Sequence, residues 1–294
     1  MAFDSGGCSD PAAGGKIDMN KRRSSEASGE TLFSLLNPDR HETPVVVSIP
    51  HSGRFIPADI RRQFLPDVVL PNMDWFLPEL YAFLADMGVT TLMNRVSRYV
   101  IDPNRAETQT DGNRYSDSLV YRQTTQGRPF YAVPPSKREI RRRTELYYHP
   151  YHAALQKLLR DKAERFGRVY LFDLHSFAAD VGAGANLILG NAHGASCSPE
   201  FFQWLSDQFS EQGFCVRHNE PFAGGYITRR YGVCGSAVEA VQIELRYCAY
   251  IENRYFGEEE LSSWDEALFC SAQKKLADVF AAITSLQSAG ATVS

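Results

Sequence analysis

The stretch PVVVSIPHSG at residues 44–53 decides the fold class of this chain. It is a short β-branched run stopped by Pro and Gly, which is typical of a buried parallel strand that enters a loop. Residues 169–176, VYLFDLHS, form a second apolar run of the same kind. In both stretches the run leads to a histidine followed by a serine. We therefore expect two buried strands that each lead to an imidazole group.

Outward from these runs, strand and helix patterns alternate. Apolar residues recur at helical spacing in DWFLPELYAFLADMG at 74–88, and residues 136–166 are also typical of a helix, with an interruption near Pro150. Such alternation predicts one α/β domain on a mostly parallel sheet. Further strands are expected at 89–94, 186–191, 214–219 and 240–247, and further helices at 198–212 and from Trp264 to about Gln287.

The remaining composition bounds the class of protein. The first part of the 294-residue chain is rich in Gly, Ser and Asp and lacks apolar periodicity, so we expect a disordered tail at residues 1–30 and a single domain at residues 31–294. A net charge of −4 provides no positive field for nucleic acid or an anionic membrane. No apolar run approaches the ~20 residues that cross a bilayer, and no secretory signal is visible. We expect a cytoplasmic protein that acts on a small molecule.

His51 and His175 are candidate metal ligands because each comes directly after, or at the end of, a buried strand. In open α/β sheets, sites form beyond the carboxyl ends of the strands, so the two imidazoles can converge there. Asp173 lies two residues before His175 on the same side of the strand, where it can accept the second N–H of a ligating imidazole. A lone histidine is more often a satisfied polar core residue, but the matched pair favours a site.

A hydrolytic zinc site needs a third protein ligand and an open position for water. Asp74 is the candidate ligand, although an aspartate at a helix start is also a preferred N-cap. Glu244 is the candidate general base, because a carboxylate in an apolar strand needs a partner or a function. A solvated or ion-paired Glu244 is the alternative. Glu239, five residues earlier, is expected to face the other side of the sheet.

Two segments carry arginines beside turn-forming or permissive residues, DPNR at 102–105 and GGYITRRYG at 224–232. The planar guanidinium of arginine binds both oxygens of a carboxylate, and glycine permits close approach of the backbone. A solvated surface charge is the alternative for either segment. The candidate substrate-binding residues are Asn104, Arg105, Arg229 and Arg230.

Eight short motifs follow one another along about residues 45–250: SIPHSG, DW, SRYVIDPNR, YHPYHAAL, DLHS, LGN, GGYITRRYG and AVQIEL. In this order they resemble the motifs of N-formylglutamate amidohydrolases, a family related to zinc carboxypeptidases and to the aspartoacylase and succinylglutamate desuccinylase group. The resemblance implies an α/β protein with a three-layer α/β/α, phosphorylase/hydrolase-like (zinc exopeptidase-like) fold and a mostly parallel mixed sheet. It also implies a water activated by Zn²⁺.

Carried over by position, the resemblance implies that His51 and His175 bind Zn²⁺, although such donors also accept other divalent metals. Carboxypeptidases place a ligating Glu three residues after the first His, and this chain has Arg54 there. The departure moves the carboxylate ligand onto Asp74. Glu244 matches the general base of the related enzymes.

The resemblance also assigns the substrate side of the site. Asn104 and Arg105 match the pair that grips a substrate carboxylate. The family typically has His where this chain has Glu239, a charge change that bears on the acyl group accepted.

Three functions are compatible with these residues. The first is a zinc amidohydrolase that removes a formyl or short acyl group from an N-acyl acidic amino acid, with N-formyl-L-glutamate and water giving formate and L-glutamate, as in histidine degradation. In this reaction Glu244 transfers the proton and Arg105 also steadies the tetrahedral oxyanion. The second is a zinc carboxypeptidase or another N-acyl amino acid deacylase. The third is a metal-free protein that binds small carboxylates.

Overall fold

The computed structural model describes residues 32–37, 43–109, 114–178 and 184–285. The expected tail at residues 1–30 lies outside these ranges. Within them, no helix combines the length and the apolar character that crossing a bilayer requires.

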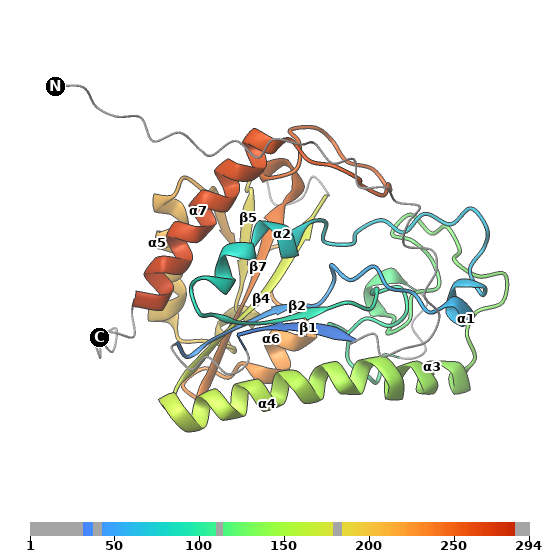
Figure 1. The fold of residues 1–294 in the computed structure, drawn as a ribbon, viewed down its shortest axis with the longest axis horizontal. Coiled ribbons are helices and arrows are strands. Elements are labelled where there is room, and N and C mark those ends of the chain that lie inside the picture. Colours follow the sequence, from blue (N-terminus) through green and yellow to red (C-terminus); the bar gives the residue numbers. More distant parts are fainter. Residues whose placement is uncertain (1–31, 38–42, 110–113, 179–183, 286–294) are drawn as a thin grey trace. The chain divides into compact units, whose positions relative to one another are not determined.

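Seven strands form one sheet in the described residues (Figure 1). They are β1 (Phe33–Leu36), β2 (Val45–Ile49), β3 (Thr90–Asn94), β4 (Val169–Phe177), β5 (Leu187–Gly190), β6 (Val216–His218) and β7 (Val238–Arg246). Their order across the sheet is β1-β3-β2-β4-β7-β5-β6. The β1–β3 and β5–β7 pairs are antiparallel and the other four pairs are parallel. The mostly parallel mixed sheet is therefore confirmed.

The described helices are α1 (Ala58–Arg61), α2 (Leu77–Leu80), α3 (Lys137–Arg143), α4 (His149–Phe166), α5 (Pro199–Glu211), α6 (Tyr226–Tyr231) and α7 (Glu266–Ser285). A π-helical segment, η3 (Thr144–Tyr148), joins α3 to α4, which accounts for the predicted interruption near Pro150. The remaining short turns are of 3₁₀ type: η1 (Ala82–Ala85), η2 (Tyr115–Asp117), η4 (Ala192–Gly194) and η5 (Tyr247–Ala249).

Helices cover both faces of the sheet. On β4, Phe172 and Leu174 pack in the apolar cluster that includes α5 and α7, whereas Leu171 packs in the cluster that includes α4. Figure 1 shows α5 and α7 on one side of the sheet and α4 along the other. This arrangement confirms the three-layer α/β/α fold. Because side chains alternate along a strand, Asp173 and His175 lie on the same side as Leu171.

The helix predicted over residues 74–88 is wrong in extent. The chain instead forms the single turn α2 and, after it, the 3₁₀ turn η1. Asp74 and Phe76 have left-handed backbones, with φ of 48° and 62°, so a right-handed helix cannot include them. The helical spacing of the apolar residues reflects burial of the two short turns against the core. Strand β1 was not expected from the sequence, and its residues are only half-buried.

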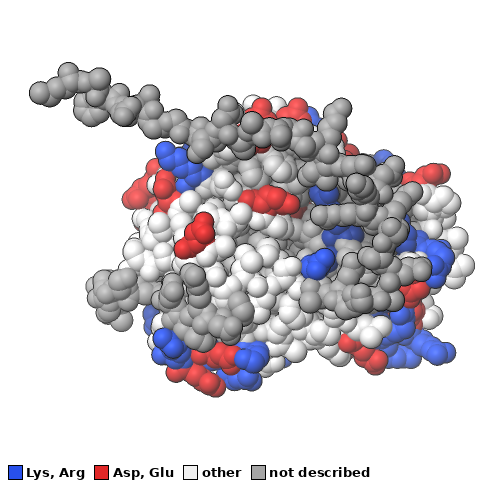
Figure 2. Space-filling model, in the orientation of Figure 1, with Lys and Arg blue, Asp and Glu red and all other residues white. Residues whose placement is uncertain are grey.

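Charged side chains of both signs are interspersed on the face that Figure 2 shows. That distribution agrees with the small net charge of −4.

Gly53 tests the packing of the loop that follows β2. A Cβ atom there would lie 2.5–2.6 Å from backbone atoms of Arg95 and Val96. These two residues directly follow β3, so their backbone cannot move independently of that strand. We expect Gly53→Ala to lower the free energy of unfolding by about 1–3 kcal/mol, as overpacking usually does. Chemical denaturation measures this change. Gly257→Ala is the matched control, because nothing lies within 4 Å of the added atom, and an equal loss in both variants would contradict the argument.

Candidate active site

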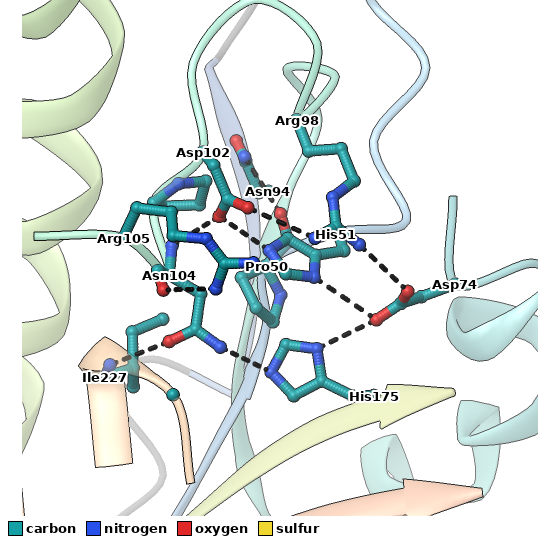
Figure 3. A network of polar contacts seen from close by, with 12 residues as sticks. Pro50, His51, Asp74, Asn94, Arg98, Asp102, Asn104, Arg105, His175 and Ile227 are labelled. Atoms are coloured by element: carbon teal, nitrogen blue, oxygen red, sulfur yellow. Dashed lines mark hydrogen bonds and ion pairs between the residues drawn. The ribbon is translucent and has the colours of Figure 1, made fainter. Parts of the chain in front are cut away.

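Two neighbouring parallel strands bring His51 and His175 together. His51 follows β2 by two residues, and His175 lies near the end of β4, so both side chains reach the same edge of the sheet. Their ring centroids are 4.7 Å apart. Figure 3 shows the carboxylate of Asp74 pointing at both rings. Its Oδ2 lies 2.8 Å from Nδ1 of His175 and 3.4 Å from Nδ1 of His51.

The three side chains form a set of potential metal donors. One ligand atom from each lies within 4.8 Å of the others, and all three residues are buried. Both imidazoles turn Nδ1 toward Asp74, and Nδ1 of His51 has no hydrogen-bond partner although it is buried. A buried ring nitrogen without a partner is unusual in a native structure and calls for an explanation. No other group of this kind is found in the described ranges.

Asp74 does not cap a helix, so the N-cap alternative is wrong. The residue before α2 is Phe76, and no side chain caps that helix. Asn72, Asp74 and Phe76 all have positive φ, which is strained for residues other than glycine. The strained segment 72–76 therefore turns the carboxylate of Asp74 away from the helix and toward the two histidines.

Side chains from four other places hold the carbonyl groups of the segment that carries Asp74. Ser52 donates to the Asp74 carbonyl at 2.7 Å, Arg98 to the Asn72 carbonyl at 3.0 Å, and Tyr250 to the Trp75 carbonyl at 2.8 Å. Tyr99 donates to the carbonyl of Pro71. Strained backbone persists where its surroundings over-determine it, and these bonds meet that condition.

The far ring nitrogens of both histidines face carboxylates. Nε2 of His51 lies 2.7 Å from Oδ1 of Asp102, and Nε2 of His175 lies 2.9 Å from Oδ2 of Asp173. The amide nitrogen of Asn104 lies 3.0 Å from the same Nε2 of His175. A carboxylate at one ring nitrogen fixes the proton there and leaves the other nitrogen free to bind a metal. The predicted contact between Asp173 and the ring of His175 is therefore present.

Asp102 and Arg98 belong to the site and were not identified from the sequence. Arg98 is buried and places Nη1 3.4 Å from Asp74 and Nη2 3.1 Å from Asp102, and Tyr121 donates to the same carboxylate oxygen of Asp102. The motif SRYVIDPNR contains the available signal. Its charged residues flank the apolar run 99–101, and such charges are buried only when they are paired.

The charges of the cluster shift the pKa values of its members. Burial alone would raise the pKa of Asp74, but the neighbouring imidazoles of His51 and His175 outweigh burial and lower it. Burial would lower the pKa of His175, but Asp173 and Asp74 raise it well above its usual value. The pKa of Asp102 falls because His51 and Arg98 outweigh its burial.

Glu244 lies on β7 directly beside His175, its partner in the parallel register. The carboxylate is buried, lines the same pocket and accepts a hydrogen bond of 2.9 Å from the side chain of Gln242. Burial raises the pKa of Glu244 to about 8, with the negative charge of Asp74 adding to the effect and His175 opposing it. A carboxylate with a near-neutral pKa in a pocket is suited to accept and return a proton.

A pocket of about 420 Å³ opens onto these groups. Asn104, Arg105 and Arg229 line it, whereas Arg230 is not among its lining residues in the described part of the chain. Oδ1 of Asn104 accepts a bond of 2.8 Å from the backbone N–H of Ile227, which fixes the side chain (Figure 3). The Nε of Arg105 is buried without a hydrogen-bond partner. Three guanidinium groups therefore line the pocket, because Arg98 does so as well. Arg98 is already paired with Asp74 and Asp102.

Two further sequence expectations concern Glu239 and Arg54. Glu239 faces away from Glu244, as predicted, because it accepts a bond from Ser198 on the other side of the sheet and pairs in register with Tyr170. It does not line the pocket, so its expected influence near the site is not supported. Arg54 stacks its guanidinium 5.0 Å from the ring of Trp75 and occupies no ligand position.

Comparisons with known proteins agree with this geometry. The model of the N-formylglutamate amidohydrolase family matches residues 43–251. The N-formylglutamate deformylase of Pseudomonas putida is 32% identical over 231 residues, covering 75% of this chain and 86% of that protein. The N-formylglutamate deformylase of Pseudomonas aeruginosa is 33% identical over 240 residues, covering 76% of this chain and 88% of that protein.

A solved structure extends the agreement to the fold. The N-formylglutamate amidohydrolase of Ralstonia eutropha JMP134 superposes with a TM-score of 0.71 at 26% identity, covering 88% of this chain and 99% of that one. The family model and the two curated relatives each span most of the described chain. The chain therefore belongs to the N-formylglutamate amidohydrolase family and is a hydrolase that acts on an amide bond.

Proposed function

We propose that the protein is an N-formylglutamate deformylase, which hydrolyses N-formyl-L-glutamate to formate and L-glutamate with a zinc ion held by His51, Asp74 and His175. L-glutamate formed in this way is the product expected of a step in histidine degradation. The observation that carries the proposal is the buried His-Asp-His cluster, whose two Nδ1 atoms face one carboxylate at the floor of a pocket.

The donor set fits zinc. Two imidazole nitrogens and one carboxylate oxygen are the ligands of many catalytic zinc sites, which keep a further position open. The orphaned Nδ1 of His51 is the group that a metal would satisfy. Asp102 and Asp173 occupy the positions of outer partners that hold ligating imidazoles in one tautomer. The same donors also accept other divalent metals.

A zinc ion bound there would supply a Lewis acid and a more acidic water. Glu244 is the residue that we assign to proton transfer. Its carboxylate oxygen takes a proton from the attacking water and returns it to the nitrogen of the leaving glutamate. The near-neutral pKa of Glu244 suits both directions of this transfer.

Asn104, Arg105 and Arg229 are the groups that we assign to substrate binding. N-formylglutamate carries two carboxylates that take no part in bond breaking. Arg105 and Arg229 both line the pocket, where the third arginine, Arg98, is already paired with Asp74 and Asp102. Arginine grips a carboxylate through two parallel N–H bonds, which orients the substrate as well as attracting it. Arg105 lies deeper in the protein than Arg229 and also steadies the oxyanion of the tetrahedral state.

Removing one ligand tests the metal site. We expect His175→Ala and His51→Ala each to weaken zinc binding more than about 100-fold, because even outer partners of such ligands change affinity 10- to 100-fold. Metal content after dialysis measures this loss, and formate release from N-formyl-L-glutamate with and without a chelator connects it to activity. His149→Ala is the control, since His149 is half-exposed and lies outside the pocket.

Full zinc occupancy in a ligand variant would remove that residue from the site. A wild-type protein that binds no zinc would favour the alternative function, a metal-free carboxylate-binding protein.

Glu244→Gln tests the general base. The variant keeps the shape and the hydrogen bond of the side chain but cannot accept a proton, so we expect kcat to fall by about 10²–10⁴-fold with zinc content unchanged. Steady-state formate release measures kcat. Glu239→Gln is a matched control, because it changes the other buried glutamate of β7 on the opposite face of the sheet. Equal turnover of Glu244→Gln and the wild-type enzyme would mean that another group is the base.

Arg229 and Arg230 provide a paired test of substrate recognition. We expect Arg229→Lys to raise KM for N-formylglutamate roughly tenfold, because a lysine keeps the charge but loses the two-pronged bond. The effect on N-formylalanine is expected to be smaller, since that substrate lacks the second carboxylate. Arg230→Lys is the control and is expected to change neither KM, because Arg230 does not line the pocket. The reverse ranking of the two variants would show that Arg230 holds the substrate.

A further inference from the structure

Hydrogen bonds from other parts of the chain hold the turn formed by residues 103–105 at its three successive backbone carbonyl groups. The Pro103 carbonyl accepts a bond of 2.9 Å from Nε2 of His152, and the Arg105 carbonyl accepts one of 2.9 Å from the hydroxyl of Tyr148. The Asn104 carbonyl accepts a bond of 3.3 Å from the backbone N–H of Tyr226 on α6. The turn that carries two pocket-lining side chains is therefore fixed by donors from two helices.

The helical register explains how Tyr148 and His152 reach this turn together. They are four residues apart, so they lie on one face of the helix, and their rings are 4.2 Å apart. The π-helical segment η3 ends at Tyr148, directly before α4 begins. A π segment inside an α-helix is rare and is found most often at functional sites. Both residues belong to the YHPYHAAL motif, which neither the metal site nor the pocket accounts for.

The partners of His152 determine its tautomer. A carbonyl oxygen can only accept, so Nε2 carries the proton that it donates to Pro103. Nδ1 then accepts from the hydroxyl of Tyr231, which lies 2.9 Å away. Burial and the nearby charge of Arg230 lower the pKa of His152 to about 4, although the bond to Pro103 opposes the shift. The ring is therefore uncharged near neutral pH and serves as a fixed donor.

We propose that His152 is a positioning residue, which sets the place of the Arg105 guanidinium in the substrate pocket by holding the Pro103 carbonyl. The inference rests on the proposed function, in which Arg105 binds a substrate carboxylate. Without this bond the turn keeps only the anchors from Tyr148 and Tyr226 and loses its constraint at Pro103. A misplacement of about 1 Å in a binding group can cost 100-fold in rate. Glycine at 225 adds to the constraint, because a Cβ there would collide with the side chain of Asn104.

Three variants of the 294-residue protein test the proposal. His152→Leu removes the donor, and we expect kcat/KM for N-formylglutamate to fall roughly tenfold, through a higher KM and a lower kcat, because Arg105 also steadies the oxyanion. His152→Gln keeps a side-chain N–H at a reach similar to Nε2 and is expected to recover most of the loss. His149→Leu makes the same change three residues earlier, at a ring that contacts Glu107 and none of the three carbonyl groups of the turn, and is expected to leave KM unchanged. Equal KM values in His152→Leu and the wild-type enzyme would overturn the proposal.

A double-mutant cycle distinguishes positioning from a general loss of stability. In an Arg105→Ala background, His152→Leu should lower kcat/KM less than threefold, because the group that it positions is already gone. The same tenfold loss in both backgrounds would show that His152 acts by another route. Thermal unfolding of each variant shows whether any loss follows stability instead.

Two further readouts separate this inference from the proposed function. A wild-type protein that does not hydrolyse N-formylglutamate would count against the function and not against the geometry. In that case ¹⁵N NMR of the imidazole still tests His152, which should be the neutral Nε2–H tautomer near neutral pH. A ring protonated on Nδ1 would overturn the proposal whatever the activity.

Discussion

The interaction on which the rest of the site depends is the contact of one buried carboxylate, that of Asp74, with two imidazoles. Burying ionisable groups is costly unless each is paired and hydrogen-bonded. The structure meets that cost by surrounding the three groups with further partners, so that Asp102 and Asp173 hold the histidines and Arg98 spans two of the carboxylates. The strained backbone at Asp74 is tolerated because side chains from elsewhere hold its carbonyl groups.

The charges of this buried region favour a cation. Three aspartates lie in contact with the two histidines, and one buried arginine, Arg98, contacts two of those aspartates. A divalent ion held by His51, Asp74 and His175 would offset the excess of negative charge and satisfy Nδ1 of His51, which has no hydrogen bond. Burial raises the pKa of Glu244, and the negative charge of Asp74 adds to this effect. The proposed metal donors and the proposed general base are therefore electrostatically coupled.

The sequence predicted the parts of the site that the sheet determines. Parallel strands end at one edge, so His51 and His175 could be brought together from strand patterns alone, and strand alternation separated Glu244 from Glu239. Sequence patterns could not decide the parts set by irregular backbone. The role of Asp74 depends on left-handed residues that the apolar spacing at 74–88 conceals.

Two further features of the site could not be predicted from the sequence, because they too depend on tertiary contacts. Asp102 and Arg98 pair within one loop, four residues apart but outside any helix, and helical or strand periodicity carries no information about such a pair. The arginines beside the glycines of 224–232 were equivalent in sequence, and only the packing of α6 places Arg229 rather than Arg230 at the pocket. The regular strands could therefore be read from local pattern, whereas the contacts that complete the site required the tertiary structure.

The proposed metal site and the proposed substrate-binding groups come from different parts of the fold. The proposed metal donors and base stand at the ends of β2, β4 and β7 or against them, on the most buried part of the sheet. The proposed substrate-binding arginines come from a loop and a short helix. Asn104 connects the two parts, because its amide oxygen accepts from Ile227 on α6 and its amide nitrogen faces His175. A change in the loop that moves Asn104 must therefore disturb His175, a proposed metal ligand, as well as the pocket. On the proposed function, substitutions on α6 that leave Asn104 in place alter substrate preference alone, because they do not reach the proposed donors.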